Sequence, residues 1–307
     1  NRWEAGQRLF GQLIREAVSR LANGKAPLWP VSVIEAGRKV LVGAGDPAFI
    51  AEALTLPGES TLTEQMEIVD PELLFAARCG LARFLAHGLE SDLLRLYHAL
   101  APTAPYQPDN LGAARRRLRN LCLGYLNEFD SPEYRTLARQ QFDATDNMTD
   151  QFAALAVLAN ATGEEGDRAL ADFYARWQGE ALVVDKWLAV QSSSRLPGTL
   201  ARVESLTQHA AFDIRNPNKV YALLRTFGAN HRHFHAADGA GYRFVAEQIV
   251  RLDPINPQVA SRLARSFDRW KRFDSERQRH SRAALESVCS QPGLSRDVFE
   301  VVDKALR

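Results

Sequence analysis

The chain has 307 residues, enough for one large domain or two ordinary ones with a buried core. Apolar residues make up 46% and charged residues 24%, and the formal net charge is +1. This balance argues against nucleic-acid binding, which needs a strongly basic domain or stripe. No apolar run approaches the roughly 18 to 20 residues that cross a bilayer, so we also expect no membrane partner.

Three cysteines, Cys79, Cys122 and Cys289, are too few and too scattered for a disulfide framework, and no C-x-x-C pair is present. They predict small buried side chains in a reducing compartment, which favours the cytoplasm. The sequence begins at Asn1-Arg2-Trp3-Glu4 without Met or a signal peptide and enters a helical pattern at once. Such a start is typical of a domain excised from a longer chain.

Helical periodicity dominates from the first residues onward, without strand-like alternation. The first pattern places Phe10 and Leu13 on one apolar face and is expected to stop at Asn23-Gly24. The next clear helix begins at Asp70-Pro71, an N-cap followed by proline, and is expected to end at His87-Gly88. The Pro-, Ala- and Thr-rich segment Leu100–Asp109 is the one plausible hinge.

The same signals recur near the C-terminus. Asn256-Pro257 predicts a helix start, and Ser295 predicts the N-cap of a final helix. The apolar face of that last helix is expected to hold Val298, Phe299, Val302 and Leu306.

Between these we expect about fifteen to eighteen short helices joined by Gly, Pro, Asn and Asp turns. Antiparallel succession of short helices without strands predicts an all-α fold over residues 1–307, a superhelical stack of helical hairpins. This is a solenoid of the armadillo or HEAT kind.

Motifs that carry hydrolytic chemistry or bind phosphate are missing. The sequence contains no H-E-x-x-H helix, G-x-S-x-G elbow, P-loop or G-x-G-x-x-G, so we expect no catalytic residue and no metal or other cofactor in this chain. The alternating histidines His231, His233 and His235 suggest a metal only if extended; a solvated loop is the preferred interpretation. The run Arg115–Arg117, with Arg119, is interpreted as a solvated helical face.

A polar row follows the helix that starts at Asn256. Gln258, Arg262, Arg265 and Arg269 are spaced i, i+4, i+7 and i+11, which predicts one helical face. Arginines can bind carboxylates or peptide carbonyls through paired hydrogen bonds. From the pattern alone, a solvated arginine face remains the simpler reading.

Seven segments, in this order, resemble one family: Ala53–Glu59 with Glu64–Pro71, Asp146–Asp150, Val184–Trp187, Asn216–Lys219, Phe234–Tyr242 and Asn256–Leu263. Together they resemble the C-terminal domain of bacterial aminopeptidase N, the zinc-dependent alanyl aminopeptidases. The resemblance covers essentially the whole chain. It implies that the zinc and the catalytic residues lie in an upstream catalytic domain of the same polypeptide.

The resemblance further implies a superhelical domain that closes over the catalytic domain and leaves a chamber for short peptide substrates. Gln258 and Arg262 match family positions that face this chamber, so we expect both to bind peptide. Tyr221 stands where a family member has a second chamber-facing arginine. Gln151 and Ala240 also depart from the family pattern and are interpreted as tolerated loop or surface changes.

A second hypothesis predicts the same fold. The chain could be a freestanding helical-repeat scaffold that binds a protein or peptide in its groove. Such a scaffold needs polar terminal helices, whereas the first helix is expected to present Trp3, Phe10 and Leu13. We therefore expect a partly apolar surface that an upstream domain covers.

Overall fold

The computed structural model describes residues 2–43 and 45–307, so Asn1 and Ala44 lie outside the described residues. Within that part of the chain we find helices and turns but no β-strand, and the all-helical prediction is confirmed. An isolated parallel bridge pairs Val69 with Phe273. No helix in the described residues is both long and apolar enough to cross a membrane.

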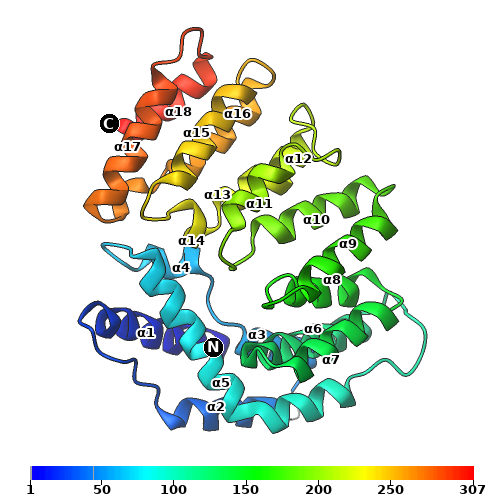
Figure 1. Ribbon diagram of the computed structural model, residues 1–307. Helices are drawn as coiled ribbons and strands as arrows, with labels where there is room; N and C mark the ends of the chain where they lie inside the picture. Colours follow the sequence, from blue (N-terminus) through cyan, green and yellow to red (C-terminus); the bar gives the residue numbers. More distant parts are fainter. Residues whose placement is uncertain (1, 44) are drawn as a thin grey trace. The chain divides into compact units, whose positions relative to one another are not determined.

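The chain divides into two compact units, 1–66 with 72–169, and 67–71 with 170–307. The first unit is drawn from blue to green in Figure 1. It contains α1 (Arg2–Ala22), α2 (Val31–Val42), α3 (Pro47–Leu54), α4 (Glu59–Glu64), α5 (Pro71–Ala99), α6 (Asn110–Leu126), η1 (Asn127–Phe129), α7 (Pro132–Ala144), α8 (Met148–Leu158) and the start of α9 (Glu165–Trp177).

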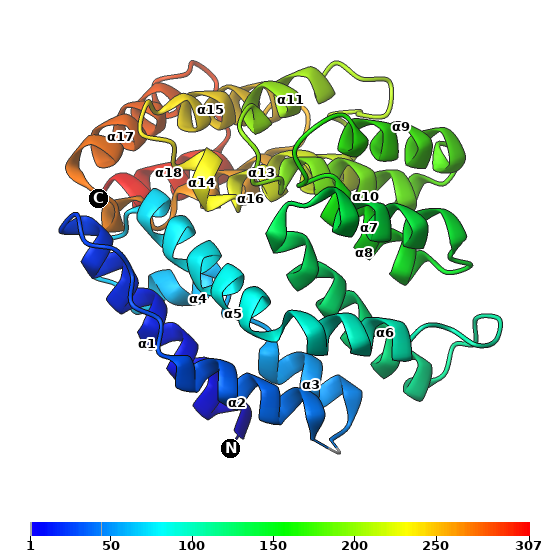
Figure 2. The ribbon, with the colours of Figure 1, turned by 60° about the horizontal axis from the view of Figure 1, so that its bottom comes forward.

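The second unit continues from α9 to the C-terminus. It contains α10 (Ala181–Ser192), α11 (Thr199–Leu206), α12 (Pro217–Val220), the π-helical turn η2 (Tyr221–Arg225), α13 (Thr226–Gly228), α14 (His231–Phe234), α15 (Ala240–Leu252), α16 (Pro257–Ala264), η3 (Arg265–Phe267), η4 (Trp270–Arg272), α17 (Ser275–Cys289) and α18 (Arg296–Leu306). Figure 2 shows α15 beside α17 and α16 beside α18, and each pair is in contact.

Helix α5 is longer than the sequence predicts. It does not end at His87-Gly88 but continues to Ala99. The missing side chain of Gly88 lets α2 approach closely, because a Cβ there would overlap Ile34. The Gly88 carbonyl also accepts a hydrogen bond from Arg38 Nη2 at 2.7 Å. Gly88 therefore serves helix packing and is not a helix stop.

Leu100–Asp109 is not a boundary between the two units. The segment joins α5 to α6, and both of these helices pack within the first unit. The division falls instead near Ala169, inside α9, and at the segment 67–71.

The first unit also buries a polar network next to α8. Asp150, 1% exposed, accepts a hydrogen bond from Asn120 Nδ2 at 2.8 Å. The Asn147 side chain accepts from the backbone N–H of Asp150 and caps the helix. Gln151 is 3% exposed, so its interpretation as a surface change is wrong. The Asn-Met-Thr-Asp segment is thus explained by capping and buried hydrogen bonds.

The core of the second unit is an aromatic cluster. The Phe234 ring packs edge-on against Phe227, Tyr242 and Phe267, with centroid distances of 6.5, 5.1 and 5.2 Å. All four side chains are at most 1% exposed. The cluster ties α13, α14, α15 and η3 together; η2 contacts α13, α16 contacts η3, and η2 and α16 also contact each other.

At the two ends of the chain, some apolar predictions fail. The first helix is expected to present Trp3, Phe10 and Leu13 on its surface. Trp3 is 43% exposed, but Phe10 and Leu13 are buried inside the first unit. In α18, Val298 and Val302 are buried as predicted, but Phe299 is 46% exposed. Ser295 caps this helix, because its hydroxyl accepts from the backbone N–H of Val298.

Candidate functional site

Helix α16 presents Gln258 and Arg262 on its exposed face. The Asn256 side chain accepts a hydrogen bond from the backbone N–H of Val259 at 3.1 Å, and Pro257 opens the first turn, as predicted. The opposite face of the helix is buried against the core through Val259, Ala260, Leu263 and Ala264. Gln258 and Arg262, one turn apart, therefore point away from the core, and both are exposed.

Tyr221 orients Arg262. Nη1 of Arg262 donates a hydrogen bond to the Tyr221 hydroxyl at 2.9 Å. Tyr221 is the first residue of the π-helical turn, in which the Thr226 backbone N–H reaches back to the Tyr221 carbonyl. Such turns are frequent at functional sites. The Gln258 amide has no side-chain hydrogen bond to any described residue and is free to bind a ligand.

Arg225 is a further residue of this site that the sequence analysis missed. Its guanidinium carbon lies 5.7 Å from the centroid of the Tyr221 ring, within the range of a cation–π contact. The i, i+4 spacing from Tyr221 is the signal that would have found it.

The predicted arginine row breaks after Arg262. Helix α16 ends at Ala264, and Arg265 lies in the 3-10 turn η3. The i+7 and i+11 positions therefore do not continue one helical face, although Arg265 and Arg269 are both exposed. Gln258 and Arg262 remain a pair without them.

The histidine segment is not a solvated loop. His231–Phe234 forms the short helix α14, and His235 is 5% exposed. The His235 ring stacks on Phe273 with centroids 3.8 Å apart, and Nδ1 lies 2.9 Å from the Tyr242 hydroxyl. Nε of Arg277 donates to the His235 carbonyl at 2.7 Å. The interpretation fails because aromatic stacking and hydrogen bonds recruit this polar segment into the core.

Burial keeps these histidines neutral. Desolvation lowers the pKa of His235 well below 6.5, and the nearby His231 and Arg277 lower it further. The pKa values of His231 and His233 are also lowered, again mainly by burial, with Arg269 and Arg232 as secondary causes. His235 is thus held by ring stacking and hydrogen bonding within the fold.

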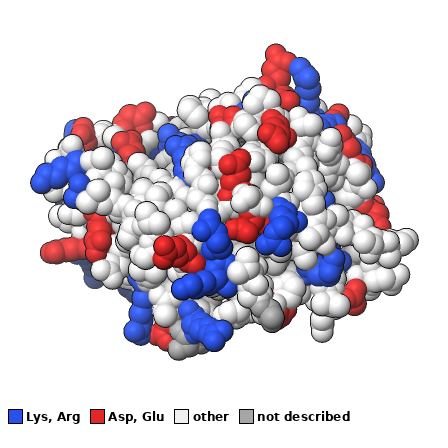
Figure 3. Space-filling model, turned by 90° about the horizontal axis from the view of Figure 1, so that it is seen from below, with Lys and Arg blue, Asp and Glu red and all other residues white. Residues whose placement is uncertain are grey.

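The arginine run on α6 is only partly solvated. Arg119 is 9% exposed, lies over the Tyr97 ring at 4.4 Å and donates to the Tyr97 hydroxyl at 3.1 Å. Arg116 lies over the Tyr106 ring at 4.7 Å, and Arg117 forms an ion pair with Glu52. These contacts explain the run without a phosphate ligand. On the face seen in Figure 3, basic and acidic side chains are interspersed.

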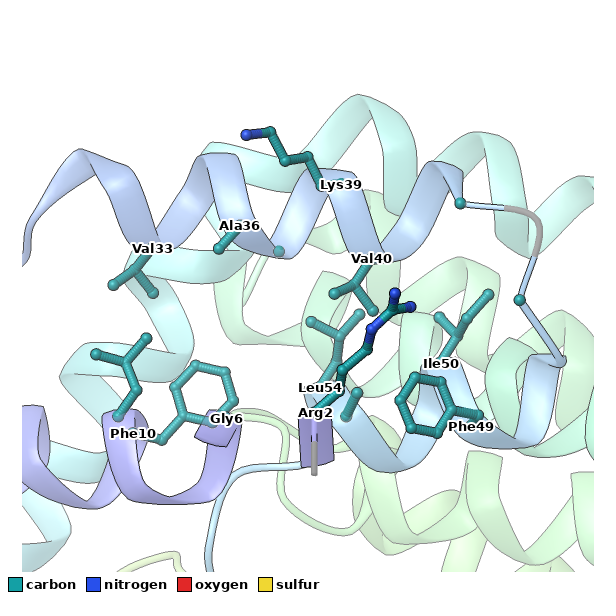
Figure 4. Close-up of a pocket in the computed structure, with 15 residues that line it drawn as sticks. Arg2, Gly6, Phe10, Val33, Ala36, Lys39, Val40, Phe49, Ile50 and Leu54 are labelled. Carbon is teal, nitrogen blue, oxygen red and sulfur yellow. The ribbon is translucent and has the colours of Figure 1, made fainter. Parts of the chain in front are cut away.

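An apolar groove of about 530 Å³ lies between α1, α2 and α3 of the first unit. Figure 4 shows Val33, Ala36 and Val40 along one wall, Phe49 on another, and Lys39 pointing away. Arg2 extends beneath Val40 (Figure 4). Apart from Arg2 and Lys39, the residues that line the groove are glycine or apolar, so the groove suits an apolar contact.

Potential metal ligands are scattered over residues 2–43 and 45–307, the part of the chain that the structure describes. These residues contain no group of three or more His, Cys, Asp or Glu side chains that could hold a metal ion. The described side chains therefore do not fit a zinc site, which needs three or four such ligands around one ion.

The chain is similar to one family of helical domains and to part of longer aminopeptidases. Residues 1–307 match a family model described as "Domain of unknown function (DUF3458_C) ARM repeats". The chain is 38% identical over 308 residues to aminopeptidase N of Escherichia coli K12, and 38% identical over 310 residues to aminopeptidase N of Caulobacter vibrioides. Each match covers 100% of this chain and 35% of the relative, so the chain spans about a third of these proteins.

A solved structure agrees. The chain superposes on Legionella pneumophila aminopeptidase A, crystallised with aspartic acid, with a TM-score of 0.90 and 32% identity. The match covers 99% of this chain and 36% of that one. The ARM-repeat description also agrees with the predicted solenoid class.

Proposed function

Because this chain belongs to the DUF3458_C family of ARM-repeat domains, we propose that it is the C-terminal accessory domain of a zinc-dependent aminopeptidase. The observation that carries the proposal is the match of the entire chain to about a third of each aminopeptidase N. In this proposal the rest of the polypeptide holds the zinc and the catalytic residues. The domain closes over that active site and limits access to short peptides.

Gln258 and Arg262 contribute binding and orientation. Both are exposed side chains fixed on one face of α16, and the Arg262 guanidinium is oriented by Tyr221. An amide and a guanidinium together can pair with the carbonyl and N–H groups of a peptide beyond the scissile bond. Holding that part of the substrate lowers the entropic barrier without taking part in bond breaking.

The upstream catalytic domain is the proposed partner, and the groove between α1, α2 and α3 is the surface proposed to contact it. The relatives have roughly two-thirds of their length outside the matched region, as the 35% coverage implies. The groove is lined mainly by apolar residues, which suits a contact with another part of the polypeptide. The three cysteines, all without disulfides, also support our proposal of a cytoplasmic location.

The residue assignment is tested in the longer enzyme. Arg262→Ala should lower kcat/KM for alanyl tripeptides about threefold to tenfold, the range for one exposed charge-assisted hydrogen bond. Hydrolysis of an alanyl anilide, which has no peptide beyond the scissile bond, should stay unchanged. Arg282→Ala, at an exposed arginine paired with Glu286 on α17, is the matched control. Equal effects of Arg262→Ala on both substrates would remove Arg262 from the peptide site.

A further inference from the structure

Two exposed arginines meet at one tyrosine ring. Arg262 donates to the Tyr221 hydroxyl at 2.9 Å, and the Arg225 guanidinium lies 5.7 Å from the centroid of the same ring. We call Tyr221, Arg225 and Arg262 the Tyr221 cluster. Its three residues come from two elements, the π-helical turn and α16, which are in contact.

The positive charge of the Tyr221 cluster is uncompensated. Neither Arg225 nor Arg262 forms an ion pair with any described acidic residue. Some other exposed arginines of the same unit have acidic partners, as the pairs Arg215–Asp213, Arg282–Glu286 and Arg296–Glu300 show. Two guanidinium groups beside one phenol, without an ion-paired carboxylate among the described residues, create a local attraction for an anion.

The local backbone explains why these side chains converge. In the π-helical turn the Thr226 backbone N–H bonds to the Tyr221 carbonyl, so Tyr221 and Arg225 lie about one turn apart on the same side. Lys219, just before this turn, is held by Asp185 Oδ1 at 2.7 Å and by the Ala181 carbonyl at 3.0 Å. The turn is therefore anchored to α10.

We propose that the Tyr221 cluster is a binding site for a carboxylate, and that its ligand is the C-terminal carboxylate of a short peptide. This inference rests on the proposed function for the choice of peptide. Guanidinium groups pair with carboxylates in a planar, charge-assisted geometry. The Tyr221 oxygen already accepts from Arg262, which leaves its own O–H to donate to a carboxylate oxygen.

Gln258 and the cluster have separate roles in this arrangement. Gln258 lies one helical turn before Arg262 on the same exposed face, so its amide can pair with the peptide backbone while the cluster holds the terminal carboxylate. In the longer enzyme, a substrate whose scissile bond lies at the active site while the cluster holds its carboxylate is selected by length. The cluster therefore favours peptides with a free carboxyl end over their amides.

The inference is tested first by direct binding to the 307-residue chain. The tyrosine rings are labelled with 13C, and NMR titrations measure Kd for N-acetyl-trialanine, for its C-terminal amide, and for an amidated N-acetyl peptide that carries one glutamate side chain. N-acetyl-trialanine should bind more tightly than its amide. The difference in Kd should be only about threefold to tenfold, because exposed arginines are partly screened by solvent. The glutamate peptide should bind more weakly than trialanine.

Matched variants assign the effect to the cluster. Arg225→Gln and Tyr221→Phe should each reduce the preference for the free acid. Arg265→Gln, at an exposed arginine outside the cluster, removes the same charge and should leave the preference intact. Thermal unfolding followed by circular dichroism verifies that each variant is folded. Equal Kd values for acid and amide, or no effect of Arg225→Gln, would overturn the inference. A glutamate peptide that binds as tightly as trialanine would overturn the C-terminal assignment.

The longer enzyme separates this inference from the proposed function. There, Arg225→Gln should raise KM for free tripeptides with little change in kcat, and should leave KM for tripeptide amides unchanged. If the isolated chain prefers the carboxylate but Arg225→Gln does not alter peptide kinetics in the longer enzyme, the carboxylate site stands and the proposed role in peptide turnover is contradicted.

Discussion

The ammonium of Lys219 lies 2.7 Å from Oδ1 of Asp185, and both side chains are largely buried, with 10% and 18% of their surface exposed. The pair joins α12 to α10 immediately before the π-helical turn that carries Tyr221 and Arg225. A largely buried ion pair positions the elements it joins, because removing one partner leaves an uncompensated charge.

Lys219→Ala should therefore destabilise the chain by about 2–4 kcal/mol, measured by urea unfolding. A double-mutant cycle with Asp185→Ala should give a coupling energy above about 1 kcal/mol, because the second substitution removes the charge that the first leaves unpaired. Lys304→Ala, at an exposed lysine, should change stability by less than about 0.5 kcal/mol. Additive effects of the Lys219 and Asp185 substitutions would show that the pair does not act as a unit.

Stability should fall on mild acidification because His235 is buried and neutral. Its pKa is well below 6.5 in the folded protein, mainly through desolvation, while the unfolded chain takes up a proton near 6.5. Below that pH the unfolded state binds more protons, so the free energy of unfolding decreases as pH falls. The limiting slope is about 1.4 kcal/mol per pH unit for each such histidine. His231 and His233 act in the same direction.

The measurement is urea unfolding at pH values from 7.5 to 5.5. His235→Phe keeps an aromatic ring against Phe273 but cannot take up a proton, so its stability should depend less steeply on pH. His98→Gln, at an exposed histidine, is the matched control and should keep the parental slope. An unchanged slope in His235→Phe would contradict the assignment.

Two glycines within helices should respond to alanine in opposite ways. At Gly88 a Cβ would overlap Ile34. This overlap outweighs the higher helix propensity of alanine, so Gly88→Ala should destabilise the chain by a net of about 1–2 kcal/mol. At Gly124 in α6 a Cβ meets no described atom within 4 Å, and Gly124→Ala should stabilise by up to about 1 kcal/mol. Thermal unfolding of both variants tests the pair. Stabilisation by Gly88→Ala would show that α2 can move away at little cost.

Much of the fold was predictable because its signals are local. Asn256, Ser295 and the Asn23-Gly24 stop are read correctly, since a cap or a turn depends on a few neighbouring residues. Gly88 is misread because its role depends on α2, a helix distant in the sequence. Leu100–Asp109 is misread because its composition does not show that the two helices it joins pack in one unit. No local pattern distinguishes a glycine that ends a helix from one that admits a neighbouring helix.

The candidate site could also be predicted only in part from the sequence. The spacing of Gln258 and Arg262 predicts a shared face, and the structure places both on it. The partner of Arg262 is Tyr221, 41 residues earlier in the chain, so periodicity within one helix cannot reveal it. His235 was misread for a related reason, since its burial depends on Phe273 and Tyr242 from other elements.

The central claim is tested most directly by hydrolysis of an alanyl anilide with added zinc, measured for this chain alone and after mixing with the separately produced remainder of the longer polypeptide. We predict no turnover by the chain alone, and a change in rate or in substrate discrimination when the two parts are mixed. Turnover by the purified chain that scales with its concentration would contradict the account, as would mixing that alters nothing, which would favour a freestanding scaffold.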